Sequence, residues 1–464
     1  MPFISLRRED VEAMLHKLGL KSLEELFSHV PAEVRCARYN LPEGLSQCEA
    51  ERLLRARAAQ NKTADQMLCF LGAGAYDHYV PAPVRELLRR GEFYTAYTPY
   101  QPEAAQGILQ ALFEYQTMIT RLTGLEAANA SLYDGATATW EALLLAVRAT
   151  GRTRVVVDAN LHPNWREVLR TAGRGPGFEL VEVPSGALQT GRDLRPVAEA
   201  VDPSTAAVIV PQIDFTGRVG DLSEPVKAAA DHGALAVVVA SPLGLTLFKS
   251  PGAYGAHVAC GEGQELGLGL QGGGPYLGFF ACRKSLIRRM PGRLVGLTVD
   301  SRGDRAFTLT LQTREQHIRR EKATSNICTN QSLCAMAAGL YLALMGREGL
   351  RRCAASCLKG TALLRERLKE IPGVQLFPGV YWREFVFRTP VPALELCRAM
   401  RERGILAGLP VKEFLSWKGS RVFRGREGEA ALWHEGDVLV AVTEKRSRED
   451  IDRYAAVLRE VLNT

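Results

Sequence analysis

The sequence predicts an α/β protein whose central sheet is mostly parallel and covered by helices on both faces. Between residues 154 and 240, short apolar runs alternate with segments of helical periodicity. The run 235–240 is continuously apolar and rich in β-branched residues, which is typical of a strand buried on both faces. Strands separated by single helices need crossover connections, and such connections produce a parallel sheet.

Each element of this alternation follows from local pattern. The predicted strands are 154–158, 179–183, 206–210 and 235–240, and the predicted helices between them are 163–172, 195–200 and 221–232. Two longer amphipathic helices, 106–123 and 134–150, come before them. Gly124 and Gly151 follow these helices directly, and glycine favours the left-handed residue that ends a helix. Two further strands are expected after residue 240, at 257–260 and 276–282.

The regions before residue 60 and after residue 329 do not show this regular alternation of strands and helices. Residues 1–60 contain short helices, with capping boxes predicted at Ser22–Glu25 and Ser46–Glu49. After residue 329 the predicted elements are helices at 329–346, 348–370, 392–403 and from Ser447, with strands at 384–388 and 438–442. We therefore expect an N-terminal helical segment (1–60), a large α/β domain (61–328) and a smaller α+β C-terminal domain (329–464).

Composition excludes several classes of protein. The net charge of +7 is dispersed along helices and forms no nucleic-acid-binding arm. No continuous apolar run reaches the ~18 residues of a membrane span, and the N-terminus has no apolar signal region. The ten cysteines show no paired CxxC spacing, so reduced thiols and no metal site are expected. We expect a cytoplasmic protein.

The stretch from Leu235 to Cys282 is the most unusual in the chain. It holds ten glycines between Gly252 and Gly278, which predicts sharp turns or close approach of backbone. It also holds no lysine between Lys249 and Lys284. The string Gly267–Gly272 matches GxGxxG, but a strand-like segment follows it instead of a helix, so it does not predict a nucleotide site.

Residues at the carboxyl ends of the predicted strands are candidates for a site, because ligands bind at that edge of open parallel sheets. The helix that starts at Gly135, Ala136 and Thr137 offers free N–H groups that suit a phosphate, although Asp134 can equally act as a simple N-cap. His162 follows the strand 154–158 and is compatible with a structural or a chemical role.

Several segments resemble the glycine cleavage P-protein family, in particular subunit 1, the N-terminal half that forms a separate chain in two-subunit versions. The similarity extends over most of the chain and is weakest in the last hundred residues. The segments are Tyr97–Glu103, Leu122–Leu125, Ala128–Leu132, Pro251–Ala256, Gly273–Phe280, Met290–Gly296 and Arg314–Glu321.

The resemblance implies the fold type I architecture of pyridoxal-phosphate enzymes. In that fold a lysine after the strand 257–260 holds the cofactor as a Schiff base, but here the turn reads Gly261-Glu262-Gly263-Gln264. An amide cannot form an imine. Ser241 also stands where an aspartate is expected to pair the pyridinium nitrogen. No cofactor is therefore expected to be covalently bound to this chain, and pyridoxal phosphate is expected on the partner, subunit 2.

The resemblance also implies an activity shared with that partner. Together the two subunits would decarboxylate glycine and transfer the aminomethyl group to the lipoyl H-protein, in an α2β2 assembly. This chain would contribute an active-site wall from an irregular, aromatic stretch. The candidate interface residues are Tyr94, Tyr97, Thr98, Tyr100 and Gln101, with close backbone approach at Gly272, Gly273 and Gly274 and a vestigial phosphate cup at Gly135, Ala136 and Thr137.

Two alternatives remain open from the sequence. The chain could be a self-sufficient pyridoxal-phosphate decarboxylase or aminotransferase that uses Lys249 or Lys284, two residues expected at the surface. It could also be a catalytically silent scaffold for the partner subunit.

Overall fold

The structure is a computed structural model that describes all residues except 1–5, 37–39, 95, 324, 417–426 and 464. The chain divides into two compact units, Met1–Lys62 and Thr63–Thr464. The division of the second unit into a large domain (61–328) and a smaller one (329–464) stays a prediction.

The first unit consists of short helices without a core of their own. Its α-helices are α1 (Arg8–Leu18) and α2 (Gln47–Ala58), and none of its described residues is buried. The capping box at Ser46 is confirmed, since Glu49 N–H donates to the Ser46 hydroxyl and the Glu49 carboxylate accepts from Ser46 N–H. The box at Ser22 is wrong. There the Glu25 carboxylate accepts from Lys21 N–H (3.2 Å), one residue too early, and the chain forms a short 3-10 helix, η1 (Leu23–Phe27).

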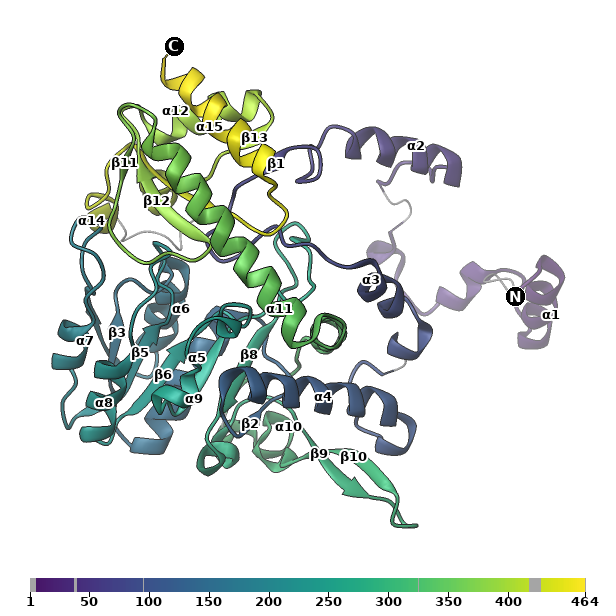
Figure 1. The fold of residues 1–464 in the computed structure, drawn as a ribbon. Coiled ribbons are helices and arrows are strands. Elements are labelled where there is room, and N and C mark those ends of the chain that lie inside the picture. The colour runs from purple at the N-terminus through teal and green to yellow at the C-terminus, as the bar shows by residue number, and fades with distance from the viewer. Residues whose placement is uncertain (1–5, 37–39, 95, 324, 417–426, 464) are drawn as a thin grey trace. The chain divides into compact units, whose positions relative to one another are not determined.

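A seven-stranded sheet forms the centre of the second unit (Figure 1). Five neighbouring strands are parallel, whereas β8 is antiparallel to β7 and β2 is antiparallel to β8. Across the sheet the order is β2 (Ala127–Ala128), β8 (Gly278–Cys282), β7 (Val258–Glu262), β6 (Leu235–Val239), β5 (Thr205–Pro211), β3 (Arg154–Asp158) and β4 (Glu179–Val183). The mostly parallel sheet is confirmed, and β3 and β4 have the predicted bounds.

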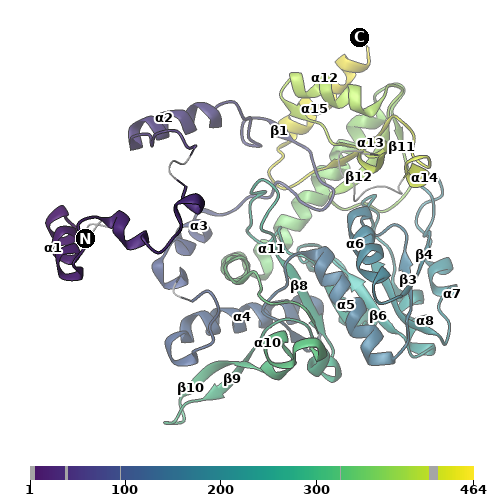
Figure 2. The same ribbon diagram turned by 180° about the vertical axis from the view of Figure 1, so that it is seen from behind.

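Helices cover both faces of this sheet (Figures 1 and 2). Alternate side chains of one strand enter different cores, Val208 and Val210 on one face and Ile209 on the other, as the two-residue period of a strand requires. The first face is covered by α4 (Gln106–Thr123), α7 (Arg195–Glu199), α8 (Ser223–Asp231) and α11 (Ser332–Lys369), and the second by α5 (Gly135–Thr150) and α6 (Pro163–Arg174). The remaining short helices before residue 320 are α3 (Ala82–Leu88), α9 (Pro251–Tyr254) and α10 (Gln316–Arg319).

A second, antiparallel sheet of four strands lies in the C-terminal part. Its order is β11 (Gln375–Leu376), β12 (Glu384–Arg388), β15 (Asp437–Ala441) and β14 (Leu409–Pro410). The helices of this part are α12 (Ala393–Glu402), α13 (Val411–Ser416), α14 (Glu427–Ala430) and α15 (Arg448–Leu462). The short strand β1 (Leu68–Cys69) pairs in parallel with β13 (Ile405–Leu406), so the start of the second unit runs beside its C-terminal part. A hairpin, β9 (Leu294–Val299) and β10 (Arg305–Thr310), completes the strands.

Helix α11 joins the two sheets. The two predicted helices, 329–346 and 348–370, correspond to the two halves of α11, which Gly346 interrupts with a non-helical backbone (φ 57°, ψ −178°). Within the described residues α11 is also the one helix that is long and apolar enough to span a membrane, with a window of mean hydropathy 1.2. Ala335, Ala337 and Ala338 of this helix lie in the core, and 44% of the window is buried.

Candidate functional site

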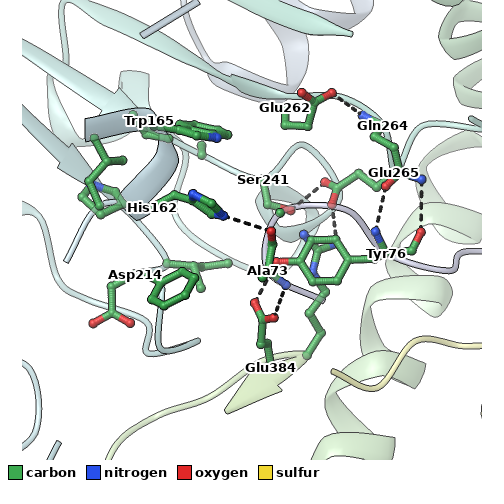
Figure 3. A pocket seen from close by; sticks show the side chains of 18 residues that line it. Ala73, Tyr76, His162, Trp165, Asp214, Ser241, Glu262, Gln264, Glu265 and Glu384 are labelled. Atoms are coloured by element: carbon green, nitrogen blue, oxygen red, sulfur yellow. Dashed lines mark hydrogen bonds and ion pairs between the residues drawn. The ribbon is translucent and has the colours of Figure 1, made fainter. Parts of the chain in front are cut away.

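The carboxyl ends of four parallel strands meet around a small cavity, which we call the closed pocket. Its walls come from the loops after β3, β5, β6 and β7, from residues 73–76 and from the start of β12 (Figure 3). Its volume is about 90 Å³. The lining residues are Ala73, Gly74, Tyr76, Leu161, His162, Trp165, Pro211, Ile213, Asp214, Phe215, Val239, Ala240, Ser241, Glu262, Gln264, Glu265, Arg383 and Glu384.

Gln264 lies in this pocket and its side chain is fully engaged. The side-chain oxygen accepts a hydrogen bond from Tyr76 N–H (3.0 Å). The side-chain nitrogen donates to the carbonyl oxygens of Tyr76 (3.1 Å) and Leu268 (2.9 Å). The residue that stands in place of the expected lysine therefore fastens the segment 73–76 to the end of β7, and both of its polar atoms bond within the chain.

The N-terminus of α5, the predicted phosphate cup, is filled by a carboxylate. Glu262 accepts hydrogen bonds from the N–H groups of Gly135 (3.0 Å), Gln264 (3.0 Å) and Leu277 (2.9 Å). Asp134 caps the same helix by accepting from Thr137 N–H (2.7 Å). Burial raises the pKa of Glu262 to about 7, against the lowering effect of its three N–H donors. Of the three predicted cup residues, two thus already have anionic partners within the chain.

A second carboxylate, Glu265, is buried and bonds to the opposite wall. It accepts hydrogen bonds from the Ser241 hydroxyl (2.6 Å) and from Leu243 N–H (2.7 Å), and it forms an ion pair with Arg383. The Arg383 guanidinium lies 3.5 Å from the centre of the Tyr76 ring. Ser241 is therefore occupied at the position where the sequence analysis expects the partner of a pyridinium nitrogen.

The closed pocket does not fit a covalently bound pyridoxal phosphate. No lysine lines it, and cavities that hold drug-sized ligands measure ~300–1,000 Å³, well above the volume here. The two alternative lysines are exposed and lie outside the lining: Lys249 stacks over the Tyr254 ring (4.1 Å), and Lys284 is at the start of a 3-10 helix. Neither residue can supply the Schiff base in this pocket.

Most of the predicted interface residues lie together at a second site, which we call the open cleft. Tyr97, Thr98, Tyr100 and Gln101 line it, together with Arg293, and its volume is about 620 Å³. Tyr97 is 82% exposed and Tyr100 50% exposed. Tyr94 lies in a neighbouring 3-10 helix (Gly91–Tyr94) and lines neither the cleft nor the pocket.

Arg293 lines the open cleft and is not among the predicted site residues. Its guanidinium donates to Asn330 Oδ1 (2.9 Å) and the Cys328 carbonyl (3.0 Å) and lies 5.5 Å from the centre of the Tyr100 ring. Its Nε is buried and has no hydrogen-bond partner within the described part of the chain. The signal was present, because Arg293 belongs to the segment Met290–Gly296 that carries the family resemblance.

The three glycines predicted for close backbone approach lie in neither site. Gly272, Gly273 and Gly274 form a turn between β7 and β8 with φ angles of 65°, 113° and 134°. No other part of the chain comes within 4 Å of a Cβ built at Gly272 or Gly273. Close approach within the chain occurs instead at Gly278, where a Cβ would collide with the Asp134 carbonyl. An approach from a partner chain stays a prediction.

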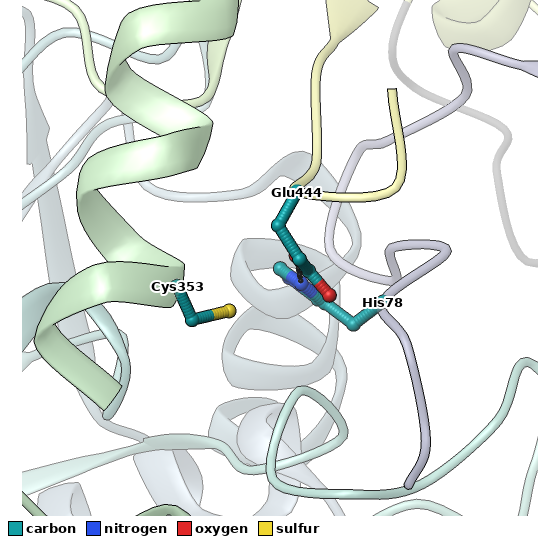
Figure 4. Close-up of side chains that lie close together, drawn as sticks. All are labelled: His78, Cys353 and Glu444. Carbon is teal, nitrogen blue, oxygen red and sulfur yellow. Dashed lines mark hydrogen bonds and ion pairs between the residues drawn. The ribbon is translucent and has the colours of Figure 1, made fainter. Parts of the chain in front are cut away.

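Figure 4 shows a cluster of three possible metal ligands, one of which, His78, lies next to the Arg383 that lines the closed pocket. His78, Cys353 and Glu444 have ligand atoms within 4.8 Å of one another. His78 Nδ1 is 2.6 Å from the Glu444 carboxylate, and its Nε2 is 3.0 Å from the Arg383 guanidinium. These groups already satisfy each other, and Arg383 would repel a divalent cation. The arrangement fits a hydrogen-bonded network better than a metal site.

Comparison with known proteins agrees with the architecture. A model of the family described as glycine cleavage system P-protein matches residues 1–406. A probable glycine dehydrogenase (decarboxylating) subunit 1 from Desulforamulus reducens is 47% identical over 461 residues, 99% of each chain. The protein of the same name from Carboxydothermus hydrogenoformans is 48% identical over 453 residues, 97% of each chain.

Two solved structures also match this chain. The crystal structure of glycine decarboxylase (P-protein) of the glycine cleavage system, in inhibitor-bound form, matches with a TM-score of 0.89 and 43% identity over 100% of both chains. A sphingosine-1-phosphate lyase from Burkholderia pseudomallei shares the fold, with a TM-score of 0.63 and 17% identity over 93% of this chain and 94% of its own. The predicted fold type I architecture is confirmed, and the chain belongs to the glycine cleavage system P-protein family.

Proposed function

We propose that this chain is the subunit of glycine dehydrogenase (decarboxylating) that lacks the cofactor lysine, and that it is active only together with a second subunit. The observation that carries this proposal is the closed pocket, in which Gln264 takes the place of the lysine and bonds to Tyr76 and Leu268. Full-length similarity to proteins named subunit 1 supports the same assignment.

In this proposal the partner, subunit 2, carries pyridoxal phosphate, which supplies the electron sink for loss of CO2 from glycine. The aminomethyl group then passes to the lipoyl group of the H-protein, and the subunits assemble as α2β2. No step of the reaction is assigned to the closed pocket, because its polar groups are engaged with one another.

The contribution of this chain to the chemistry would come from the open cleft. Exposed aromatic rings beside a buried arginine are typical of interfaces that a partner completes. Tyr97, Tyr100 and Gln101 would form a wall over the partner's active site, and the free Nε of Arg293 would meet an acceptor from the partner or the substrate. Thr98, Tyr94 and the turn at Gly272–Gly274 would belong to the same contact surface.

The first experiment separates this proposal from a self-sufficient enzyme. The purified chain is incubated with pyridoxal phosphate, reduced with borohydride and analysed by mass spectrometry, with the partner subunit treated in parallel. We expect a pyridoxyl-lysine adduct on the partner and none on this chain. An adduct at Lys249 or Lys284 of this chain, with activity on glycine unaided, would refute the proposal.

The second experiment separates an active-site wall from a silent scaffold. Glycine–bicarbonate exchange is measured for the reconstituted pair with Tyr97→Phe or Tyr100→Phe in this chain. Tyr79→Phe is the matched control, because Tyr79 is also exposed (59%) and lines neither site. We expect the first two variants to lower exchange by about tenfold or more, the size of one lost transition-state hydrogen bond, while the control keeps full exchange. Full activity in all three would favour the scaffold.

A further inference from the structure

The anion at the N-terminus of α5 comes from a distant part of the chain. Glu262, at the end of β7, lies 127 positions from Gly135, whose N–H it accepts at 3.0 Å. An ordinary N-cap is local, and this helix already has one in Asp134. A second, remote carboxylate at the same helix end is therefore not needed for capping alone.

The three donors around Glu262 form a cradle for an anion. They are backbone N–H groups from three separate segments: the first residue of α5, the turn after β7 and the residue before β8. The positive end of a 16-residue helix dipole points at the same spot. Three converging N–H groups at a helix N-terminus are the arrangement that proteins use to hold phosphate oxygens.

Packing closes the cradle against other ligands. A Cβ at Gly135 would overlap the Trp165 ring and lie 2.9 Å from Glu262 N, so the indole and the strand end cover the first turn of the helix. On the far side, His162 Nε2 is 2.9 Å from the Ala73 carbonyl, and Glu384 accepts hydrogen bonds from Ala73 N–H (2.6 Å) and the Tyr76 hydroxyl (2.8 Å). The segment 73–76 is thereby held across the mouth.

We propose that the Glu262 carboxylate is a built-in substitute for a bound phosphate group, so that the closed pocket is a coenzyme site permanently occupied by the chain's own side chains. The chemical class for which the cradle is built is a phosphate-like oxyanion. Removal of the carboxylate would turn the pocket into a site for inorganic phosphate. The inference depends on the fold and on these contacts, and it holds whether or not the chain takes part in glycine decarboxylation.

The test removes the carboxylate and offers phosphate in return. The melting temperature of the full chain is measured for wild type, Glu262→Ala and Glu141→Ala at increasing inorganic phosphate, against chloride at equal ionic strength. Glu141 is the matched control, because it is a buried glutamate on the same helix that bonds none of the cradle's three N–H groups. All measurements are made at pH 8, where phosphate is mainly dianionic.

We expect phosphate to raise the melting temperature of Glu262→Ala in a saturable way, by ~1–2 °C at about ten times its Kd, and to leave the other two proteins unchanged. Isothermal titration should then give one phosphate site per chain in this variant. An equal response of Glu262→Ala and Glu141→Ala would overturn the proposal.

If Glu262→Ala does not fold alone, recovery of folded chain after dilution from urea becomes the readout. The proposal then requires that phosphate increases recovery of this variant and not of Glu141→Ala. Recovery that is independent of phosphate would refute it. Neither readout uses the partner subunit or glycine, so a failure here is distinct from a failure of the proposed function.

Discussion

The closed pocket and the open cleft differ in how their polar groups are satisfied. In the closed pocket, Gln264, Glu262 and Glu265 each bond to several groups of the same chain; Gln264 and Glu265 are buried and Glu262 is half-buried. In the open cleft, Tyr97 is 82% exposed and the Nε of Arg293 is buried without a partner. The polar side chains named for the first region bond to one another and to nearby backbone, whereas the second region has a buried Arg293 Nε without a partner in the described residues.

This difference predicts which substitutions change stability and which change activity with the partner. Buried polar networks that are fully satisfied rigidify a protein, and removing one member leaves the others unpaired. Exposed aromatic rings contribute little to the stability of the isolated chain and much to binding. Substitutions in the closed pocket should therefore change stability, and substitutions in the open cleft should change activity with the partner.

Arg383→Met is expected to have the largest effect on stability. It removes the cation paired with Glu265, which is 3% exposed, and leaves that carboxylate buried without its counter-charge. Breaking a buried ion pair in this way typically costs ~3–5 kcal/mol. Urea unfolding measures the change. Arg302→Met is the control, because its pair with Asp300 is at the surface (Arg302 side chain 79% exposed), where such pairs contribute ~0–1 kcal/mol. Equal losses of unfolding free energy in the two variants would show that the buried pair contributes no more to stability than the surface pair.

The central sheet was predictable from the sequence because its signals are local. The run 154–158 forms the buried strand β3, and 179–183 forms the edge strand β4, which has no buried residue; both strands have the predicted bounds. The capping box predicted at Ser22 is wrong although its motif is present, because the Glu25 carboxylate accepts from Lys21 N–H instead of Ser22 N–H. A capping motif predicts an α-helix only where the residues after it form one, as they do after Ser46 but not after Ser22.

The closed pocket could be predicted only in part. The absence of a lysine was visible, since it concerns one residue type in one turn. Its internal bonding was not visible, because Gln264 meets Tyr76 across 188 positions and Arg383 meets Glu265 across 118. Such partners depend on how the C-terminal sheet docks against the parallel one, and no periodicity in the sequence reports that. The open cleft was easier to predict, because its aromatic residues, Tyr97 and Tyr100, are close together in the sequence.

Acid should weaken the network next to the closed pocket. Although burial raises the pKa of Glu444, its hydrogen bond to His78 and the charge of that ring lower it to about 2, below the ordinary value of 4.5. Because the folded pKa is depressed, the stabilisation is present above pH ~4.5 and is lost as the pH falls towards 2. The loss should reach roughly 3 kcal/mol. Unfolding free energies of wild type and Glu444→Gln measured from pH 6 to 2 should converge as the pH approaches 2. Parallel curves would contradict this pKa.

Gly135→Ala should show how tightly the closed pocket is packed. The added methyl would overlap the Trp165 ring and approach Glu262 N to 2.9 Å, so either the indole or the strand end has to move. Overpacking of this kind costs ~1–3 kcal/mol. Gly107→Ala is the control, since Gly107 lies in α4 with no atom within 4 Å of its Cβ, and alanine there should stabilise by ~0.5–1 kcal/mol. Thermal unfolding of both variants measures the difference. An unchanged melting temperature for Gly135→Ala would mean that the space around Gly135 can hold an added methyl group.

Tyr97→Ala in the open cleft should have the smallest effect on the isolated chain. The ring is 82% exposed and its hydroxyl forms no hydrogen bond within the described residues, so its removal should change the unfolding free energy by no more than ~0.5 kcal/mol. The same variant should lower the affinity for the partner subunit, because aromatic side chains of this kind are common binding hot spots that cost ≥ ~2 kcal/mol when truncated. Titration calorimetry with the partner measures the second quantity and urea unfolding the first. A loss of stability without a loss of affinity would reverse the distinction between the two regions, since the cleft would then belong to the core and the partner would have to bind elsewhere.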